Sequence, residues 1–226
     1  MSSAPHSGNT TEERIEFFRR KVVDFYLTRG HRWPWRETRD PYVILITELL
    51  LQKTTARQVV KVFSSFFSKF PNIEALAKAG EADIEAVIGE LGLRKRAGFL
   101  RELARHVVEE FGGRIPDTLK DLMKLKGVGL YTANAVRSFA YGMCVPVVDR
   151  NVARVLRRFF GLEEEKPAYA DRELWKFAEK MMPTSACREF NYGLIDLGAM
   201  ICTSREPQCG KCPLRPECTY FLNIKA

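Results

Sequence analysis

Two carboxylates in this 226-residue chain stand in contexts that suit acid–base chemistry. Glu48 lies inside the apolar run Val43–Leu51, where burial without partners would favour its protonated form. Asp149 follows Val-Pro-Val-Val and precedes a strongly patterned helix, which is the position of an N-cap. One protonated and one ionised carboxylate suit cleavage of a glycosidic bond through an oxocarbenium-like state. Two plainer interpretations remain: Asp149 as a cap alone, and Glu48 as an exposed residue.

A second group of chemically active residues is a cysteine loop near the C-terminus. The stretch "CTSREPQCGKCPLRPEC" has the spacing C-x6-C-x2-C-x5-C, at Cys202, Cys209, Cys212 and Cys218. In an intracellular chain, where disulfides are rare, four close thiolates indicate a metal centre, either zinc or an iron–sulfur cluster. The other two cysteines, Cys144 and Cys187, are interpreted as small buried hydrophobic residues.

The stretch "LKGVGLYTANAV" contains a Gly-Val-Gly turn between two helical patterns, Thr118–Leu125 and Tyr131–Tyr141. No strand pattern precedes Gly127, and the spacing fits neither a dinucleotide nor a Walker loop. We expect the turn glycines to permit positive φ, and the second helix to offer unpaired N–H groups to an anion. Either a plain helical corner or a hairpin that holds a DNA phosphate fits this pattern, and the basic charge favours the second.

The composition narrows the possible partners. The formal net charge is +8, which favours a polyanion such as nucleic acid, and 46% of the residues are hydrophobic, enough for a sizeable core. No stretch reaches the length of a membrane span, and the polar start "MSSAPHSGNT" lacks the layout of a signal peptide. We therefore expect an intracellular protein that acts as a monomer, with residues 1–11 as a disordered leader.

These candidate residues must be positioned by helices. Apolar residues recur at helical spacing along most of the chain, and no convincing two-residue alternation appears. One such stripe comprises Ile15, Phe18, Val22, Phe25 and Tyr26. The sequence therefore predicts an all-α fold of about ten helices, without internal repeats.

Taken in order, the hairpin "LKGVGLYTA", the aspartate of "VVDRNV" and the cysteine loop resemble the helix-hairpin-helix DNA glycosylases of the endonuclease III and MutY superfamily. The resemblance covers residues 17–218. It implies a six-helix barrel over residues 41–146, with the hairpin at about 118–141. It also implies a cluster domain from residues 12–40 and 147–226, a [4Fe–4S] cluster on the four loop cysteines, and double-stranded DNA bound in a cleft between the domains.

The branch of the superfamily can be narrowed. "RWPWRETRDPYVILITELLLQKT" resembles the MutY and thymine-mismatch branch, in which the residue matching Glu48 is catalytic. Lyases of the endonuclease III type carry a hairpin lysine where this chain has Tyr131, so imine chemistry is not expected. The chain stops soon after its cysteine loop and has Leu93 where MutY enzymes commonly have tyrosine. It is thus more similar to compact archaeal-type T·G mismatch glycosylases than to adenine glycosylases of the MutY type.

The resemblance implies a monofunctional enzyme that flips a mispaired base, thymine or uracil opposite guanine, and hydrolyses its glycosidic bond. Asp149 would stabilise the sugar cation or activate water, Glu48 would assist base departure, and Tyr131 would line the pocket. The DNA-binding positions would be Gly127 and Gly129 on the backbone, and Gln52, Lys53 and Leu93 at the vacated stack. Adenine removal opposite guanine or 8-oxoguanine is the alternative, and a non-catalytic, cluster-bearing DNA-binding protein is a second.

Overall fold

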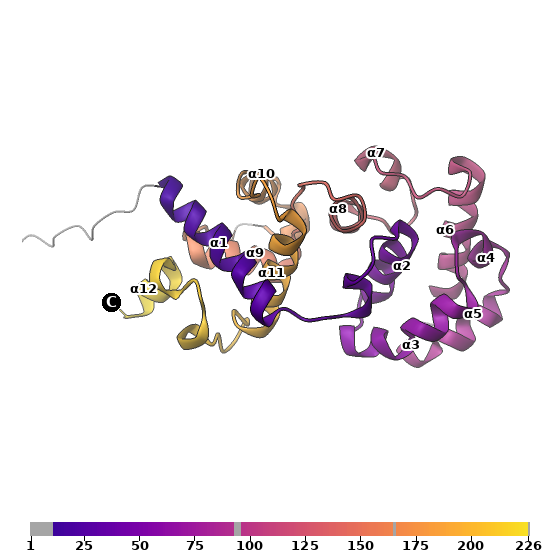
Figure 1. Cartoon of the computed structure of the whole chain (residues 1–226), viewed down its shortest axis with the longest axis horizontal. Helices are drawn as coiled ribbons and strands as arrows, with labels where there is room; N and C mark the ends of the chain where they lie inside the picture. The colour runs from indigo at the N-terminus through magenta and orange to yellow at the C-terminus, as the bar shows by residue number, and fades with distance from the viewer. Residues whose placement is uncertain (1–10, 93–95, 165, 226) are drawn as a thin grey trace, which may run out of the picture. The chain divides into compact units, whose positions relative to one another are not determined.

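The computed structural model describes residues 11–92, 96–164 and 166–225, and these residues form helices joined by turns, without a β-strand (Figure 1). This confirms the all-α prediction for the described chain. The predicted leader falls almost wholly outside these residues, and Leu93 lies outside them too. None of the described helices is long and apolar enough to cross a membrane.

The α-helices of the described residues are α1 (Thr11–Arg29), α2 (Pro41–Leu51), α3 (Ala56–Lys69), α4 (Ile73–Lys78), α5 (Glu81–Ile88), α6 (Arg96–Phe111), α7 (Leu119–Leu122), α8 (Leu130–Phe139), α9 (Arg150–Phe160), α10 (Arg172–Lys180), α11 (Cys187–Met200) and α12 (Thr219–Lys225). Short 3₁₀ turns lie at Pro34–Arg36, Gly89–Leu91, Ala168–Ala170, Cys209–Lys211 and Arg215–Glu217.

The chain divides into two compact units. Unit 1 comprises Met1–His31 and Cys144–Ala226, and unit 2 comprises Arg32–Met143. The sequence-based divisions, at 40/41 and 146/147, are placed somewhat later in the chain. Unit 2 is therefore inserted between the first helix of unit 1 and the rest of that unit.

Helix α11 is the centre of unit 1, where it packs against α1 and α9 (Figure 1). A Cβ atom on Gly193 would stand 2.5 Å from the carbonyl oxygen of Val22 on α1, so glycine permits the close approach of these two helices. The buried Phe18 of α1 adds ring contacts to Phe159 of α9 and Phe190 of α11. The expected apolar stripe of α1 is buried except at Ile15, which is half-buried.

Unit 2 contains α2 to α8, with α2 packed against α8 and α4 against α6. Local capping explains where its helices begin. Asp40 accepts hydrogen bonds from the N–H groups of Tyr42 and Val43, and Pro41 occupies the first turn of α2. Thr55 and Gln58 form a capping box at the start of α3.

The first helix of the predicted hairpin is shorter than expected, because α7 ends at Leu122 rather than Leu125. After Leu122 the backbone continues in turns that bond three residues back, from Lys124 N–H to the Asp121 carbonyl and from Leu125 N–H to the Leu122 carbonyl. This tighter winding leads the chain into the glycine turn.

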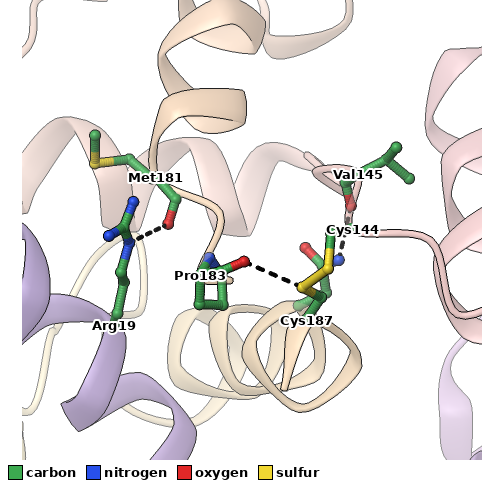
Figure 2. The surroundings of a disulfide bond; sticks show 7 residues. Arg19, Cys144, Val145, Met181, Pro183 and Cys187 are labelled. Atoms are coloured by element: carbon green, nitrogen blue, oxygen red, sulfur yellow. Dashed lines mark hydrogen bonds between the residues drawn. A yellow bond between two sulfur atoms is a disulfide. The ribbon is translucent and has the colours of Figure 1, made fainter. Parts of the chain in front are cut away.

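The interpretation of Cys144 and Cys187 as small buried hydrophobic residues is wrong. They form a disulfide with a Cα–Cα distance of 5.2 Å, and only Cys187 is buried, whereas Cys144 is exposed (Figure 2). Their separation of 43 residues hides this pairing from local sequence patterns.

Candidate functional site

Asp149 is the N-cap of α9, as its sequence position predicted. Its Oδ1 accepts a hydrogen bond of 2.7 Å from the N–H of Val152, which would otherwise lack a partner in the first turn. The helix ends at Gly161, whose left-handed backbone (φ 75°) closes the last turn onto the Arg157 carbonyl. Local sequence signals therefore fix both ends of the helix that presents Asp149.

The second oxygen of Asp149 belongs to a side-chain network. Asn151 Nδ2 donates to Asp149 Oδ2 at 3.0 Å, and Arg154 Nη2 donates to Asn151 Oδ1 at 2.9 Å. The same arginine reaches the Gly198 carbonyl of α11 at 2.8 Å and, through Nε, the Cys202 carbonyl at 2.7 Å. Arg154 thus connects the surroundings of Asp149 to both α11 and the start of the cysteine loop.

Desolvation raises the pKa of the Asp149 carboxyl above its ordinary value. Hydrogen bonds from Val152 and Asn151, and the charge of Arg154, act in the opposite direction but do not cancel the effect of burial. The group combines partial exposure with a shifted proton equilibrium, which is typical of functional carboxylates.

Glu48 is buried within α2, with 6% of its surface exposed. Of the two interpretations of the sequence, the buried one is therefore confirmed and the exposed one is wrong. Its neighbours Thr47 and Leu49 are also fully covered, so α2 is an almost wholly internal helix. Helix α2 packs against α8, the helix that carries the half-buried Tyr131.

The turn after α2 presents Gln52 and Lys53 at the surface. Lys53 has a left-handed backbone with φ 62°, which is uncommon for a residue with a side chain and often marks functional turns. Arg96 of α6 holds this turn: Nη1 donates to the Leu49 carbonyl at 2.6 Å, and Nη2 donates to the Gln52 carbonyl at 2.7 Å.

The two glycines of the hairpin have different roles. Gly127 has φ 73°, as expected, and a Cβ atom there would lie 2.4 Å from the ring of Phe99. Gly129, where the sequence also permits positive φ, instead has an extended backbone as the N-cap of α8. Gly129 has no side chain that could cap this helix. Gln52 Nε2 donates to the Gly127 carbonyl at 3.2 Å and joins the turn after α2 to the hairpin.

Lys126, which directly precedes the turn, is engaged elsewhere. Its Nζ lies 2.6 Å from Glu102 Oε2 of α6, and both side chains are exposed. The hydrogen bond from Lys126 lowers the pKa of the Glu102 carboxyl.

The four loop cysteines are unpaired and half-buried in unit 1. Burial, together with the charges of the other three cysteines, raises the pKa of the Cys212 thiol to about 12, so all four groups interact electrostatically. Backbone N–H groups and Arg158 Nη1, 3.6 Å from Cys202 Sγ, supply donors that would stabilise thiolates.

Among the described residues, no three His, Cys, Asp or Glu side chains are grouped closely enough to hold a single metal ion. A tetrahedral zinc site needs four sulfurs at about 2.3 Å from one ion. In a [4Fe–4S] cluster each thiolate binds a different iron, so the sulfurs stand farther apart. Four thiols are a donor set that suits both zinc and a [4Fe–4S] cluster.

Comparison with known proteins identifies the family. The family described as "HhH-GPD superfamily base excision DNA repair protein" matches residues 46–180 of this chain. This range contains Glu48, the hairpin and Asp149. The chain belongs to this superfamily. The resemblance to helix-hairpin-helix DNA glycosylases is confirmed.

A thymine/uracil-DNA glycosylase of Methanothermobacter thermautotrophicus is 42% identical over 94% of this chain and 97% of that protein. An adenine DNA glycosylase of Buchnera aphidicola is 34% identical, but the chain covers only 60% of it. Among solved structures, that of a thermostable thymine-DNA glycosylase has a TM-score of 0.90 at 42% identity and covers 95% of this chain and 100% of that one. A non-covalent endonuclease III–DNA complex has a TM-score of 0.81 at 26% identity, over 96% and 99% of the two chains.

The sequence-predicted residues fall into separate groups. Gln52 meets Gly127 within unit 2, and the four cysteines share one loop of unit 1, close to the network of Asp149. Sequence reasoning missed Asn151, Arg154 and Arg96. The first two could have been found from their spacing of three residues on α9, whereas Arg96 is far in sequence from the turn that it holds.

Proposed function

We propose that the protein is a monofunctional DNA glycosylase that removes thymine or uracil mispaired with guanine. The observation that carries this proposal is the 42% identity to a thymine/uracil-DNA glycosylase over nearly the full length of both proteins. A net charge of +8 suits a duplex DNA partner, and the protein is proposed to act on it as a monomer.

In the proposed reaction the mispaired base is flipped out of the duplex, which requires less energy for a mismatch than for a paired base. Glu48, buried on α2, assists departure of the base. Asp149, held by Val152 and Asn151, stabilises the developing sugar cation or accepts a proton from the attacking water. The half-buried Tyr131 lines the base pocket.

DNA positioning is assigned to the surface of unit 2. The uncapped start of α8, after Gly129, offers backbone N–H groups to a phosphate. Lys53 and Gln52, on the turn that Arg96 supports, are proposed to contact the stack vacated by the flipped base. Leu93 is assigned the same role from the resemblance alone.

The direct test is base excision on matched duplexes containing T·G, U·G, A·G or A·8-oxoguanine, followed by alkali to cleave abasic sites. Cleavage of T·G and U·G duplexes is expected. Preferential cleavage of the adenine duplexes would favour the MutY-like alternative, which the lower identity to the adenine glycosylase, 34% against 42%, makes less favoured. Binding without cleavage of any duplex would indicate a non-catalytic DNA-binding protein.

Tyr131 supports the monofunctional part of this proposal, because a phenol cannot form the imine that a lyase needs. Abasic strands should stay intact until alkali is added, and borohydride should trap no adduct. Tyr131→Lys should produce trapping by placing an amine at this position, whereas Lys126→Ala should change nothing. Trapping by the unmodified enzyme that is lost in Lys126→Ala would assign the protein to the lyases.

Cys202, Cys209, Cys212 and Cys218 are proposed to hold a [4Fe–4S] cluster, on the chemistry of the donor set. When bound, the cluster would supply a covalently cross-linked core to a loop that otherwise has little regular structure. The protein should be brown, with broad absorbance near about 400 nm and about four irons per chain. A colourless protein with stoichiometric zinc after anaerobic purification would refute the cluster.

A further inference from the structure

The segment that leads to Asp149 is attached to α11 at two points one helical turn apart. Cys144, at the start of the segment, is bonded to Cys187 (Figure 2). Asn191 donates through Nδ2 to the Val145 carbonyl at 2.9 Å and accepts from the N–H of Val147 at 3.2 Å.

The disulfide and the bonds of Asn191 hold a segment that has no hydrogen bonds of a helix or strand to fix it. The chain between α8 and α9 is neither helix nor strand, although residues 146–148 are buried. Asn191 is itself 1% exposed, so losing either of its bonds would leave buried polar groups of the backbone without that partner. The geometry of the segment is therefore set largely from α11, and the next residue in the chain is Asp149.

The backbone directly before Cys187, the second cysteine of the disulfide, also has an unusual conformation. Ala186, directly before Cys187, has φ 55°, which a residue with a Cβ atom adopts only when its surroundings impose it. Arg19 of α1 donates to the Met181 carbonyl at 3.1 Å (Figure 2) and to the Lys180 carbonyl at 2.9 Å, and so anchors the end of α10, from which the chain turns into α11. The disulfide thus joins two restrained segments.

We infer that the Cys144–Cys187 disulfide and Asn191 are positioning elements for Asp149, and that the disulfide-bonded enzyme excises bases faster than the reduced enzyme. This inference rests on the proposed function of Asp149. A displacement of about 1 Å at a reacting group is enough to slow catalysis substantially. Greater mobility of the segment before Asp149 should therefore lower the rate of the excision step.

An external dithiol can supply the two electrons that reduce the Cys144–Cys187 disulfide. Its thiolate attacks the sulfur of Cys144, which is an exposed residue, the sulfur–sulfur bond breaks, and Cys187 leaves as a thiolate that takes up a proton. A second thiolate of the reagent then releases Cys144, so two electrons and two protons reach the protein and the reagent becomes a disulfide. Cys187 Sγ lies 3.2 Å from the Pro183 carbonyl, which can accept a hydrogen bond from the new thiol. Opening the disulfide therefore leaves the buried thiol with a partner.

The test compares the oxidised wild type with Cys144→Ser, whose altered side chain is exposed, and with Asn191→Ala. Single-turnover excision is expected to fall about tenfold in each variant at a temperature where circular dichroism shows it folded. Affinity for a duplex with a non-hydrolysable nucleotide should change less than twofold. A dithiol should slow the wild type by a similar factor and leave Cys144→Ser unchanged, which controls for effects on other cysteines.

The effect of Cys144→Ser in a variant that lacks the Asp149 carboxylate shows whether the disulfide positions that group or only stabilises the fold. In an Asp149→Asn background, Cys144→Ser should change the residual rate by less than twofold, because the group that it positions is absent. Unchanged excision in Cys144→Ser, or free Cys144 and Cys187 thiols in the aerobic wild type by thiol labelling, would overturn the inference while leaving the proposed function intact. Unchanged excision in Asp149→Asn alone would overturn the inference and the proposed role of Asp149, and would leave base excision as the function of the protein.

Discussion

The turn before α9 and the turn after α2 both present a candidate residue at a helix end, but they are held in different ways. Asp149 follows a buried segment that a disulfide and a buried amide fix to α11. Lys53 lies on an exposed turn that hydrogen bonds from Arg96 and to Gly127 support from outside. One turn is fixed in the interior, and the other is supported at the surface.

This difference corresponds to what each turn is proposed to do. A group that acts on a sugar carbon must stand within a fraction of an ångström of its target, and burial supplies that restraint. A side chain that enters a distorted DNA stack must adapt to it, so an exposed turn is better suited. Each turn also contains one feature that lowers the stability of the folded protein. This feature is the desolvated carboxylate of Asp149 in one turn and the left-handed backbone of Lys53 in the other.

The largest expected effect is the loss of base excision in Asp149→Asn. Asparagine also caps helices well, so the fold and DNA binding should persist, but it cannot stabilise a cation or accept the proton of water. Single-turnover excision should fall about a hundredfold or more, about 2.7 kcal/mol of barrier. Asp40→Asn, at the cap of α2, is the matched control and should stay within about twofold. A loss of less than about tenfold would leave Asp149 a cap alone.

Arg96→Ala tests the exposed turn. The variant loses the hydrogen bonds to the Leu49, Leu50 and Gln52 carbonyls, so its free energy of unfolding should fall by about 2 kcal/mol. Affinity for duplex DNA should weaken, with a smaller effect on the excision step, as measured by titration and single-turnover kinetics.

Arg101→Ala is the control for that experiment, since Arg101 lies on the same helix and makes only a surface ion pair with Glu81. Its effect on the free energy of unfolding should be below about 1 kcal/mol. Equal effects of the two substitutions would show that the turn does not depend on Arg96.

Lys53→Gly and Lys53→Ala separate the backbone of the turn from its charge. Both remove the ammonium group and should weaken DNA binding equally. Only glycine relieves the left-handed strain at φ 62°, so the glycine variant should be more stable than the alanine variant by about 1 kcal/mol in urea unfolding. Equal stabilities would mean that the turn carries no strain.

The smallest expected effect is the pH dependence of stability at Asp149. Desolvation raises its pKa in the folded protein, so ionisation destabilises the fold as pH rises from the ordinary value, 3.8, through the raised one. The stability of Asp149→Asn relative to the wild type should therefore increase from about pH 3 towards neutrality. Urea unfolding at a series of pH values measures this, and the opposite slope would mean that the carboxyl pKa is lowered.

Features with local causes could be predicted from the sequence. The cap at Asp149 depends on the next three residues, and the burial of Glu48 depends on the apolar run around it. The positive φ that the sequence permits at both turn glycines occurs at Gly127, whereas Gly129 precedes α8 in an extended conformation.

Features that depend on distant parts of the chain could not be predicted. Asn191 resembles any polar residue of a helix until its bonds to Val145 and Val147 are seen. The Cys144–Cys187 bond was not expected, because disulfides are rare in intracellular proteins and the two cysteines are 43 residues apart. The catalytic roles of Asp149, Glu48 and Tyr131 stay predictions, since each depends on activity measurements.

The insertion of unit 2 within unit 1 has a consequence for biosynthesis. Unit 2 is a continuous stretch of chain, so all of it has left the ribosome before α11 is made. The apolar face of α1 has to wait for α11 and α9, on the order of ten to thirty seconds at typical elongation rates. During that time Phe18 and its neighbours are open to chaperones or to wrong contacts. The first helix made is therefore packed only after most of the chain has been synthesised.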